Sequence, residues 1–551
     1  MVRKRVEEEL VSKLKTTALE LYSPEKEILG ELSLEIPASS SFGDLSTNIA
    51  LRLSKKAKLS PREVANAFCD KLKADIKNDE FLSKYVGEFV VAGPGFINIS
   101  FKNDFYYNLV SEVLKEKSSF GRSKLDKNRK VQIEFVSANP TGPLSIAHAR
   151  QAAVGDALGN ILKFSGFSVT KEYYINDEGN QINILGLSTL ARLKQILKEE
   201  VEFKEDYYQG EYIFDIAKEI LEKHPNYKDK DPEFFRDYAV NYLLNVIKSE
   251  LSDFGVNFDI WFSQKTLDRA KIMQTLGFLR TKGYIFDEDG AVWFKSTLFG
   301  DDKDRVVIKK DGSFTYLAPD IAYHENKFKR GFDEVIDIWG PDHHGYQGRL
   351  SAAVQALGQN KEQLKVLIIQ LATIYRNGKP VSMSTRRAQY ISLREVLDEV
   401  GRDAARFFFM MRKISSHLDF DLELAKSQTS DNPVYYVQYA HARISSILKN
   451  AGSFEEGSNL SLLNEKEELE LMRAIFKYEE VLSLCVKNLD PCNLTAFLQE
   501  IASLFHKFYD KHKVLVDDVK LKSARLSLIK AVKIILENSL KILGISAPEN
   551  M

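Results

Sequence analysis

Hydrophobic and polar residues follow different patterns in three successive parts of the chain. In the first part the charged opening segment MVRKRVEEELVSKL has helical spacing, and a Ser-rich turn at Ala38–Ser41 precedes a second helical segment through Asn48–Lys56. Two short β-rich runs in EFVVAGPGFINISF are separated by Gly93-Pro94-Gly95, which predicts a hairpin. Residues 1–120 are therefore expected to form a small α+β domain, followed by the polar linker KSSFGRSKLDKNRK.

The middle part, from about Val131 to Ala425, alternates short apolar runs with helical segments. VQIEFV, EVIDIW and KVLIIQLATIY predict buried strands, while QAAVGDALGNILKF and GRLSAAVQAL carry small and apolar residues at helical spacing. Buried strands separated by helices predict a Rossmann-like, doubly wound parallel sheet of the α/β class over residues 125–430. Between about Thr189 and Phe299 the strand pattern disappears, so a charged helical insertion is expected over residues 189–299.

From about Pro433 the pattern is helical throughout. Asp490-Pro491 predicts a helix start, with an N-cap carboxylate and a proline in the first turn. The following apolar stripe consists of Leu494, Phe497, Leu498, Ile501, Leu504, Phe505 and Phe508. The last helix is expected to end at Gly544, with Pro548 just beyond. Residues 431–551 are therefore expected to form an all-α bundle.

Composition narrows the class of protein. The chain has 551 residues, 44% hydrophobic and 28% charged, which fits a globular protein with domains of ~100–200 residues each. The net charge is −1, so nucleic acid would have to bind to local basic patches. Cys69, Cys485 and Cys492 match no zinc-ligand or disulfide pattern, which favours a reducing compartment. Without a signal-peptide core or an apolar run of ~18 residues, a cytoplasmic protein outside the membrane is expected.

The segment VQIEFVSANPTGPLSIAHARQAAVGDAL carries the strongest chemical signal. A strand ends near Val136, an extended Asn-Pro-Thr-Gly-Pro loop follows, and a helix begins near Ala147. A helix N-terminus at the carboxyl edge of a parallel sheet attracts phosphate through its free N–H groups and its dipole. Gly142 leaves room for a nucleotide, and His148 offers a ring nitrogen to a phosphate oxygen. The plainer alternative is a strand–helix crossover with a solvated histidine.

This segment resembles the first signature of class I aminoacyl-tRNA synthetases, His-x-Gly-His. NPTGPL before the signature, AVGDAL after it and YYINDEGNQI at Tyr173–Ile182 resemble the bacterial-type arginyl-tRNA synthetases in particular. The resemblance implies an ATP site whose residues are Pro140, Thr141, Gly142, Pro143, Leu144, Ser145, Ala147, His148, Asp342, His344, Met383 and Ser384.

NGKPVSMSTRRAQYISLREVLDEV resembles the second signature of the same enzymes, Lys-Met-Ser-Lys-Ser. That loop closes over the triphosphate and stabilises charge on the departing pyrophosphate, which requires mobile donors and cations. The resemblance implies that the catalytic residues are His148, Ser145, Ser384, Arg386 and Arg387.

Both signatures depart from the family pattern. Ser145 replaces the usual first His and Ala147 the Gly, so only His148 is retained; Ser382 and Thr385 replace the two lysines of the second signature. Loss of one donor to transition-state charge typically lowers the rate ~10²–10³-fold. We expect the hydroxyl of the serine in the first signature and the two adjacent arginines in the second to compensate.

The segment DGSFTYLAPDIAYHENKF lies between the two signatures. Tyr316 and Asp320 are four residues apart and share one face if this turn is helical, and a carboxylate pairs with a guanidinium through two hydrogen bonds. The pair resembles the arginine-pocket Tyr and Asp of the family; the alternative is a surface Asp beside a core Tyr. The resemblance implies an arginine site made of Ser137, Asn139, Tyr316 and Asp320.

A metal site is not expected at the neighbouring sequence IWGPDHHGYQGRL. Asp342, His343 and His344 follow a predicted strand end, but adjacent residues of an extended chain point in opposite directions. The resemblance instead implies that this segment lines the pocket for adenosine and the amino acid.

The outer parts of the chain also resemble the family. SFGDLSTNIALRLSKK and VVAGPGFINI resemble the domain that contacts the tRNA elbow, and the stretch from VYYVQYAHARISSIL onward resembles the anticodon-binding domain. Aromatic residues Phe505, Phe508 and Tyr509 are offered for core packing or base stacking. The nearby basic residues are either a binding patch or a solvated face: Lys507, Lys511, Lys513, Lys520, Lys522, Arg525, Lys530 and Lys533.

The resemblance implies an arginine–tRNA ligase. Such an enzyme uses ATP with Mg²⁺ to convert L-arginine to arginyl-adenylate, then transfers arginine to the 3′ end of tRNA(Arg) and releases AMP and pyrophosphate. No zinc or organic cofactor is expected, and the family implies a monomer whose activation step depends on bound tRNA. Two alternatives stay open. Another class I synthetase or nucleotidyl transferase is disfavoured by Tyr316 and Asp320, and a non-catalytic RNA-binding paralogue is supported only by the altered signatures.

Overall fold

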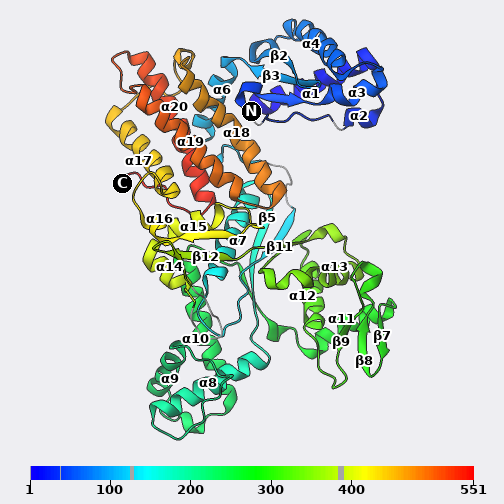
Figure 1. Cartoon of the computed structure of the whole chain (residues 1–551), viewed down its shortest axis with the longest axis vertical. Coiled ribbons are helices and arrows are strands. Elements are labelled where there is room, and N and C mark those ends of the chain that lie inside the picture. The colour runs from blue at the N-terminus through cyan, green and yellow to red at the C-terminus, as the bar shows by residue number, and fades with distance from the viewer. Residues whose placement is uncertain (1, 31, 38, 124–128, 382–389) are drawn as a thin grey trace.

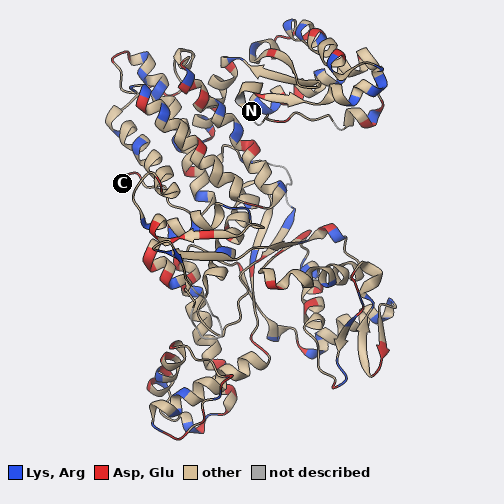
Figure 2. Cartoon of the chain, viewed as in Figure 1, with Lys and Arg blue, Asp and Glu red and all other residues tan. Residues whose placement is uncertain are grey.

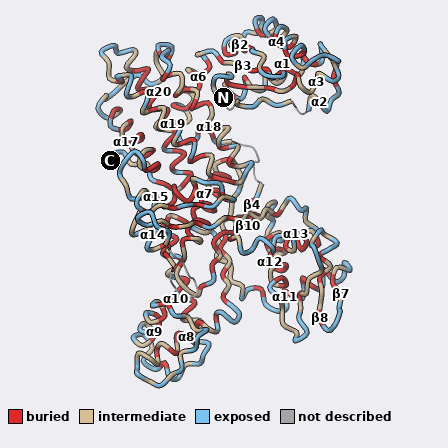
Figure 3. The backbone as a smooth tube through the Cα atoms, in the orientation of Figure 1, coloured by how far each residue is buried: buried red, intermediate tan, exposed pale blue. Residues whose placement is uncertain are grey.

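The computed structural model of the protein describes residues 2–30, 32–37, 39–123, 129–381 and 390–551. Its central part is a parallel sheet with its covering helices; the N-terminal domain and a helical bundle lie at one end, and two smaller modules at the other (Figure 1). Buried positions run continuously from the N-terminal domain through the bundle into the central sheet (Figure 3). None of the helices in the described ranges has both the length and the apolar character needed to cross a bilayer.

The central sheet has five parallel strands in the order β11-β10-β4-β5-β6. The strands are β4 (Lys130–Glu134), β5 (Ser168–Ile175), β6 (Ile260–Ser263), β10 (Glu334–Trp339) and β11 (Leu364–Ile368). Helix α7 (Ile146–Phe164) connects β4 to β5. The sheet is built outward from β4 in one direction by β5 and β6 and in the other by β10 and β11, so its topological switch point lies between β4 and β10. This arrangement confirms the predicted Rossmann-like class.

The N-terminal domain is the predicted α+β module. Its antiparallel sheet has the order β1-β3-β2, and residues 93–95 form the turn between β2 and β3. The elements are α1 (Val2–Tyr22), α2 (Lys26–Gly30), β1 (Leu45–Thr47), α3 (Ile49–Ala57), α4 (Pro61–Lys77), α5 (Leu82–Tyr85), β2 (Val86–Ala92), β3 (Phe96–Phe101) and α6 (Asn103–Glu116). Helix α6 packs against the C-terminal bundle, so the outer domain is attached there (Figure 1).

The expectation that residues 189–299 form a helical insertion without strands was wrong. This stretch contains β6 of the central sheet and two strands of a separate antiparallel sheet ordered β7-β8-β9. Two modules lie in and around this stretch. The first, the helical module, consists of α8 (Asn180–Ile196), α9 (Tyr212–Lys223) and α10 (Pro232–Asp253). The second consists of α11 (Arg269–Thr281), β7 (Ile285–Glu288), β8 (Ala291–Phe294), β9 (Arg305–Ile308) and α12 (Leu317–Lys329). Strands of four residues are too short to establish an alternating pattern among charged neighbours.

The remaining elements of the middle region follow the sheet. They are α13 (Gln347–Ala356), β12 (Ala372–Arg376), β13 (Lys379–Pro380), α14 (Leu393–Val400), α15 (Arg402–Met410), β14 (Leu418–Asp421) and α16 (Leu422–Lys426). Strands β13, β12 and β14 form a third small sheet, in which Asn377 and Gly378, both with positive φ, make the turn between β12 and β13.

The C-terminal part is the predicted helical bundle of α17 (Pro433–Ala451), α18 (Lys466–Asn488), α19 (Cys492–Lys511) and α20 (Val519–Ile542). Helix α19 begins at Cys492, and Asp490 Oδ1 accepts the N–H of that residue at 2.9 Å, one residue later than the predicted start. Phe505 and Phe508 are fully buried, so these two aromatics belong to the core.

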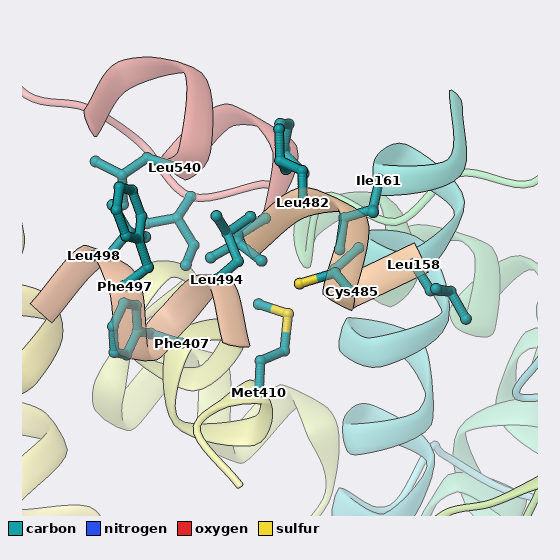
Figure 4. Close-up of a cluster of buried hydrophobic side chains, with 14 of the residues drawn as sticks. Leu158, Ile161, Phe407, Met410, Leu482, Cys485, Leu494, Phe497, Leu498 and Leu540 are labelled. Atoms are coloured by element: carbon teal, nitrogen blue, oxygen red, sulfur yellow. The ribbon is translucent and has the colours of Figure 1, made fainter. Parts of the chain in front are cut away.

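The bundle also packs against the C-terminal half of α7. Ile161 of α7 lies beside Leu482 and Cys485 of α18, and Phe407 of α15 lies beside Phe497 of α19 at the other end of the same apolar cluster (Figure 4). Next to this apolar contact, the buried Arg406 donates to Asp156 Oδ2 of α7 at 2.6 Å and to the Leu543 carbonyl at 2.9 Å. Helix α7 is therefore held from its C-terminal half by the bundle, while its N-terminus reaches the switch point of the sheet.

Candidate active site

The chain leaves β4 through a strained turn at the switch point. Ser137 N–H donates to the Phe135 carbonyl at 2.9 Å, and Val136 between them has φ of 67°. A positive φ is unfavourable for a β-branched residue, and such strain gathers at functional sites. Gly155 of α7 makes the turn possible, since a Cβ there would lie 2.3 Å from Phe135 Cγ. The turn thus directs the Asn139–Leu144 loop away from the strand towards the start of α7.

His148 stands in the first turn of α7. Its Nδ1 lies 3.1 Å from Ser145 N and 3.1 Å from Ser145 Oγ. Because a backbone N–H can only donate, Nδ1 is the acceptor, and the neutral ring carries its proton on Nε2. Burial lowers the pKa of His148 to about 4, although the nearby Asp342 raises it. The ring is therefore a neutral hydrogen-bond donor at physiological pH.

The predicted ATP residues that follow β10 lie in a short 3₁₀ turn, η6 (Pro341–Tyr346). The side chains of Asp342, His343 and His344 are all exposed, and His343 Nε2 lies 3.3 Å from Asp342 Oδ2. A Cβ on Gly340 would lie 2.6 Å from Asp342 Oδ1 and 3.5 Å from Gln151 Nε2, so the Asp342 carboxylate lies near the first turns of α7. The structure thus brings Asp342 close to the first signature, and His344 is an exposed residue of the same turn.

A pocket of ≈ 580 Å³ lies beside the Asn139–Leu144 loop. Five of the predicted ATP-site residues line it (Thr141, Gly142, Pro143, Ser145 and His148), together with the predicted arginine-site residue Asn139. Asn139 Nδ2 donates to Gln181 Oε1 at 2.8 Å. The rest of the lining comes from Tyr390, which follows the second signature, and from residues of the helical module: Gln181, Ile184, Glu205, Asp206, Tyr207, Tyr208, Gln209 and Tyr212.

The second-signature residues Ser382, Met383, Ser384, Thr385, Arg386 and Arg387 lie outside the described residues. The segment that follows them is joined directly to the first signature. Ile146 N–H donates to the Ile391 carbonyl at 3.1 Å, and Leu393 N–H donates to the Leu144 carbonyl at 2.7 Å. These two bonds form an antiparallel bridge between Ser145 and Ser392. The first signature and the segment that follows the second one, far apart in sequence, are therefore anchored next to each other.

A second group of polar side chains surrounds Asp320 in the first turn of α12. Tyr346 Oη donates to Asp320 Oδ2 at 2.5 Å, and burial raises the pKa of Asp320. Ser137 Oγ donates to Glu134 Oε1 at 2.9 Å and accepts the N–H of Tyr174 at 3.1 Å. Among the residues that the structure describes, no lysine or arginine forms an ion pair with Asp320. This partly buried carboxylate thus has no lysine or arginine partner within the described ranges.

The acidic groups below Asp320 are, by contrast, paired. Lys327, fully buried, lies 2.6 Å from Glu134 Oε2 and 2.7 Å from Asp337 Oδ1. His324 contacts the Asp320 carbonyl through Nδ1 and Asp337 Oδ2 through Nε2, each at 2.8 Å. Burial alone raises the pKa of Asp337, but Lys327 and His324 outweigh it and hold that pKa below its usual value. The network fixes α12 against β4 and β10.

Tyr316 and Asp320 are joined as predicted but do not line one wall. Asp320 N–H donates to the Tyr316 carbonyl at 3.3 Å, which makes this turn helical, yet the Tyr316 side chain is 81% exposed. The aromatic ring that contacts Asp320 is Tyr346, which the sequence did not single out. Glu134 was also missed, although a charged residue within the apolar run VQIEFV is a usable signal.

The described residues offer no group of three or more His, Cys, Asp or Glu side chains that could hold a metal ion. The three cysteines are unpaired thiols, two of them buried.

Three family models match consecutive parts of the chain. They are described as the arginyl tRNA synthetase N terminal domain over residues 4–101, the catalytic domain of class I (R) tRNA synthetases over residues 109–441, and the DALR anticodon binding domain over residues 437–551.

Curated relatives match over nearly their whole length. The arginine–tRNA ligase of Geobacter sp. (strain M21) is 46% identical over 532 residues, which cover 94% of this chain and 95% of the relative. That of Geobacillus thermodenitrificans is 46% identical over 537 residues, with 95% of each chain covered. The solved structure of Thermus thermophilus arginyl-tRNA synthetase matches with a TM-score of 0.77 at 22% identity, covering 99% of this chain and 100% of that one, and supports the fold.

Proposed function

Because the chain belongs to the arginyl-tRNA synthetases and is an arginine–tRNA ligase, we propose that both small substrates bind at the switch point between β4 and β10. The ATP phosphates lie at the N-terminus of α7, and the arginine guanidinium lies at Asp320. The observation that carries this proposal is the partly buried Asp320 carboxylate, which has no cationic partner among the residues that the structure describes and lies near a strand end that leads to the N-terminus of α7.

The arginine site follows from charge. Burial disfavours the ionised form of Asp320, so a guanidinium that pairs with it restores the lost solvation and is selected over an uncharged side chain. Glu134 and Ser137 form the adjacent polar wall. Asn139 follows them at the start of the Asn139–Leu144 loop, which is proposed to contact ATP and is called the ATP loop below. Tyr316, exposed at the start of α12, is proposed to cover the bound arginine rather than to line the pocket floor.

The ATP site is inferred from the hydrogen-bond donors at the start of α7. His148 donates through Nε2, Ser145 offers a hydroxyl, and the N-terminus of α7 adds the positive end of the helix dipole. The residues proposed to contact ATP are those of the loop and helix start, Pro140, Thr141, Gly142, Pro143, Leu144, Ser145, Ala147 and His148, with Asp342, His344, Met383 and Ser384.

Mg²⁺ is proposed to arrive with ATP. This ion usually keeps several waters and binds through substrate phosphates and one or two carboxylates, and Asp342 supplies one carboxylate near His148. Bound there, it would neutralise phosphate charge.

The reaction has two steps. The arginine carboxylate attacks the α-phosphorus of ATP; the bond to the bridging oxygen breaks, and pyrophosphate leaves with arginyl-adenylate remaining. A hydroxyl of the terminal tRNA ribose then attacks the arginyl carbonyl and releases AMP. Neither step uses a covalent enzyme intermediate, so the residues act by positioning the reactants and by donating hydrogen bonds to phosphate oxygens as charge shifts to the leaving group.

A charging experiment tests the proposal as a whole. The purified chain is incubated with ATP, Mg²⁺, total tRNA and each labelled amino acid in turn, and label is counted in precipitated RNA. Arginine alone is expected to be incorporated. Binding of tRNA without incorporation would instead favour the non-catalytic paralogue.

Arg386 and Arg387 are proposed to replace the two missing lysines of the second signature. Their position lies outside the described residues, so this rests on the sequence and on the anchoring of the following segment to the first signature. Replacing both arginines with alanine is expected to lower the arginine activation rate ~10²–10³-fold, because charge on the departing pyrophosphate loses its donors. The rate is measured by pyrophosphate exchange with tRNA present. Near-normal exchange in the double variant, beside an Arg412→Ala control, would contradict the compensation.

The anticodon end of the tRNA is proposed to bind an aromatic platform on α17 and α19. Tyr435 stacks on Tyr439 at 6.1 Å, Tyr439 stacks on His506 at 5.9 Å, and the Arg443 guanidinium lies over Tyr439 at 4.9 Å and over Tyr509 at 5.1 Å. These side chains are partly exposed. Unpaired bases stack on such rings and on arginine planes.

The lysine-rich end of the chain is a weaker candidate than this platform. Lysine and arginine positions alternate with acidic ones over the bundle (Figure 2). Within the basic set named from the sequence, four members form ion pairs inside the bundle: Lys511 with Glu467, Arg525 with Glu468, Lys530 with Glu456 and Lys533 with Glu549. Arg525 is buried and belongs to the core.

Tyr439→Ala is therefore expected to raise the tRNA KM for charging about 5- to 150-fold, the loss of stacking on one base. The arginine KM should stay unchanged, because the platform lies in the bundle and not at the switch point. Phe278→Ala, a partly exposed aromatic on α11, serves as the control. Equal tRNA KM values for the two variants would show that the anticodon binds elsewhere on the enzyme.

The domain assignment proposed with this function is an N-terminal elbow-binding domain over residues 1–120, a catalytic domain over 125–430 and an anticodon-binding domain over 431–551. The enzyme is proposed to act as a cytoplasmic monomer. Light scattering of the purified chain tests the oligomeric state directly.

A further inference from the structure

Two tyrosine hydroxyls hold the ATP loop on either side of Gly142. Tyr212 Oη donates to the Thr141 carbonyl at 2.7 Å, and Tyr390 Oη donates to the Pro143 carbonyl at 3.0 Å. Gly142 lies so close to both that a Cβ on it would be 3.1 Å from Tyr212 Oη and 3.5 Å from Tyr390 Oη. Both hydroxyls thus converge on three consecutive residues of the loop.

The two tyrosines come from distant parts of the chain. Tyr212 is the first residue of α9 in the helical module, and Tyr390 immediately precedes the bridge that joins Ile391 and Leu393 to the first signature. Burial raises the pKa of both hydroxyls, so each keeps its proton and remains a donor at neutral pH. The helical module, whose role the sequence left open, therefore touches the proposed phosphate site through Tyr212.

The geometry of the loop explains why a hydrogen bond to its carbonyls affects a ligand. Pro140 and Pro143 have no N–H, and the N–H of Thr141 donates to the Asn139 carbonyl at 2.7 Å. Among the described residues, no hydrogen bond engages the N–H of Gly142. Over residues 140–143, Gly142 N–H is thus the backbone donor left for an anion.

The Thr141 carbonyl and the Gly142 N–H belong to one planar trans peptide, so they point in opposite directions. When Tyr212 fixes the carbonyl, it also fixes the direction of the N–H. Without that hydrogen bond the peptide can rotate about the dihedrals of Thr141 and Gly142, and glycine resists such rotation least.

We propose that Tyr212 and Tyr390 are positioning residues for the ATP step, which hold the Thr141–Pro143 segment so that Gly142 N–H and the start of α7 face the triphosphate together. Tyr212 sets the peptide plane, and Tyr390 ties the other end of the segment to the residues that follow the second signature. This inference rests on the proposed placement of the phosphates at His148.

The test removes one hydroxyl at a time in the full-length enzyme. Tyr212→Phe, Tyr390→Phe and the double variant are compared with Tyr238→Phe, which removes a hydroxyl that donates to Glu219 at 2.7 Å in the same helical module. Pyrophosphate exchange with tRNA present gives kcat and the KM values for ATP and arginine, and thermal unfolding gives Tm. His148→Ala is measured alongside as the reference for the phosphate site.

Each single variant is expected to lower kcat about 10- to 100-fold, since misplacing a group by about 1 Å has effects of this size. The arginine KM should stay within about twofold and Tm should match that of Tyr238→Phe, because the hydroxyls position a loop and carry little of the fold. The double variant should lose less than the product of the single losses, because the two hydroxyls act on one segment.

Kinetics of Tyr212→Phe and Tyr390→Phe equal to those of Tyr238→Phe would overturn the inference, and so would rate losses that merely follow a fall in Tm. If His148→Ala is impaired while the tyrosine variants behave like the control, only this inference fails. If His148→Ala is itself unimpaired, the phosphate placement fails and the inference falls with it.

Discussion

Asp320→Asn is expected to fold normally and to require far more arginine. Breaking a desolvated charge pair costs about 2–5 kcal/mol, so the arginine KM in pyrophosphate exchange should rise roughly 30- to 4,000-fold, while the ATP KM changes little. Folding does not suffer, because burial disfavours the ionised carboxyl and the amide oxygen still accepts the hydrogen bond from Tyr346. The Tm should therefore equal or exceed that of the parent enzyme.

The control for this change is Glu325→Gln on the same helix. Glu325 pairs with Lys329 at 2.9 Å and accepts a hydrogen bond from Thr275 at 2.7 Å, away from the switch point. Glu325→Gln removes one negative charge from α12, so it measures how much of the change in arginine KM comes from long-range electrostatics. An arginine KM that rises equally in both variants would show that Asp320 is not the contact of the guanidinium. Citrulline, the uncharged analogue, should bind the parent enzyme weakly, and Asp320→Asn should narrow that difference.

His148→Ala is expected to lower the rate of arginine activation ~10²–10³-fold, the loss typical of one donor to transition-state charge. His148→Gln keeps a side-chain N–H and should recover part of the rate. His224→Gln, in the helical module, is the control. Because the pKa of His148 is lowered to about 4, the ring stays neutral and the ratio of parent to His148→Gln rates should be constant between pH 6 and 8. A ratio that changes across this range would mean that the imidazolium form takes part.

The same pKa has a consequence for stability. As the pH falls from 6.5, the usual pKa of histidine, to about 4, His148 takes up a proton in the unfolded chain but not in the folded enzyme. His148 therefore lowers the free energy of unfolding progressively through that pH range and has no effect above it. Urea unfolding as a function of pH should show this dependence in the parent enzyme and its loss in His148→Gln.

Much of the fold could be predicted where periodicity is long. The bundle helices and α7 have enough turns for an apolar stripe to appear, and β4 and β10 form continuous apolar runs. By contrast, β6 to β9 have four residues each. Strand β6 pairs with β5, far earlier in the chain, whereas β7, β8 and β9 pair with one another as neighbours in sequence. A strand of that length is defined by the hydrogen bonds of its neighbours, which local pattern does not contain.

The candidate site divides in the same way. His148, Asn139 and Asp320 belong to phrases that resemble the family, so the sequence located them. Tyr346, Tyr212 and Tyr390 act through single hydroxyls that reach their acceptors only after folding, and no spacing rule connects Tyr212 with a carbonyl 71 residues away. The role of Tyr316 stays a prediction: it shares a helical turn with Asp320, but its side chain is largely exposed.

The packing of α7 against the bundle also sets the order in which a newly made chain can become an enzyme. Ile161 of α7 is covered by Leu482 and Cys485 of α18 (Figure 4). Arg406, which binds Asp156 of α7, donates to the carbonyl of Leu543, just past α20. A ribosome that has finished the five-stranded sheet still holds α18, α19 and α20 unmade or inside its exit tunnel. Until those helices emerge, the helix that carries His148 has an uncovered apolar face and a buried charge without its full set of partners, and catalysis must wait until they have packed against it.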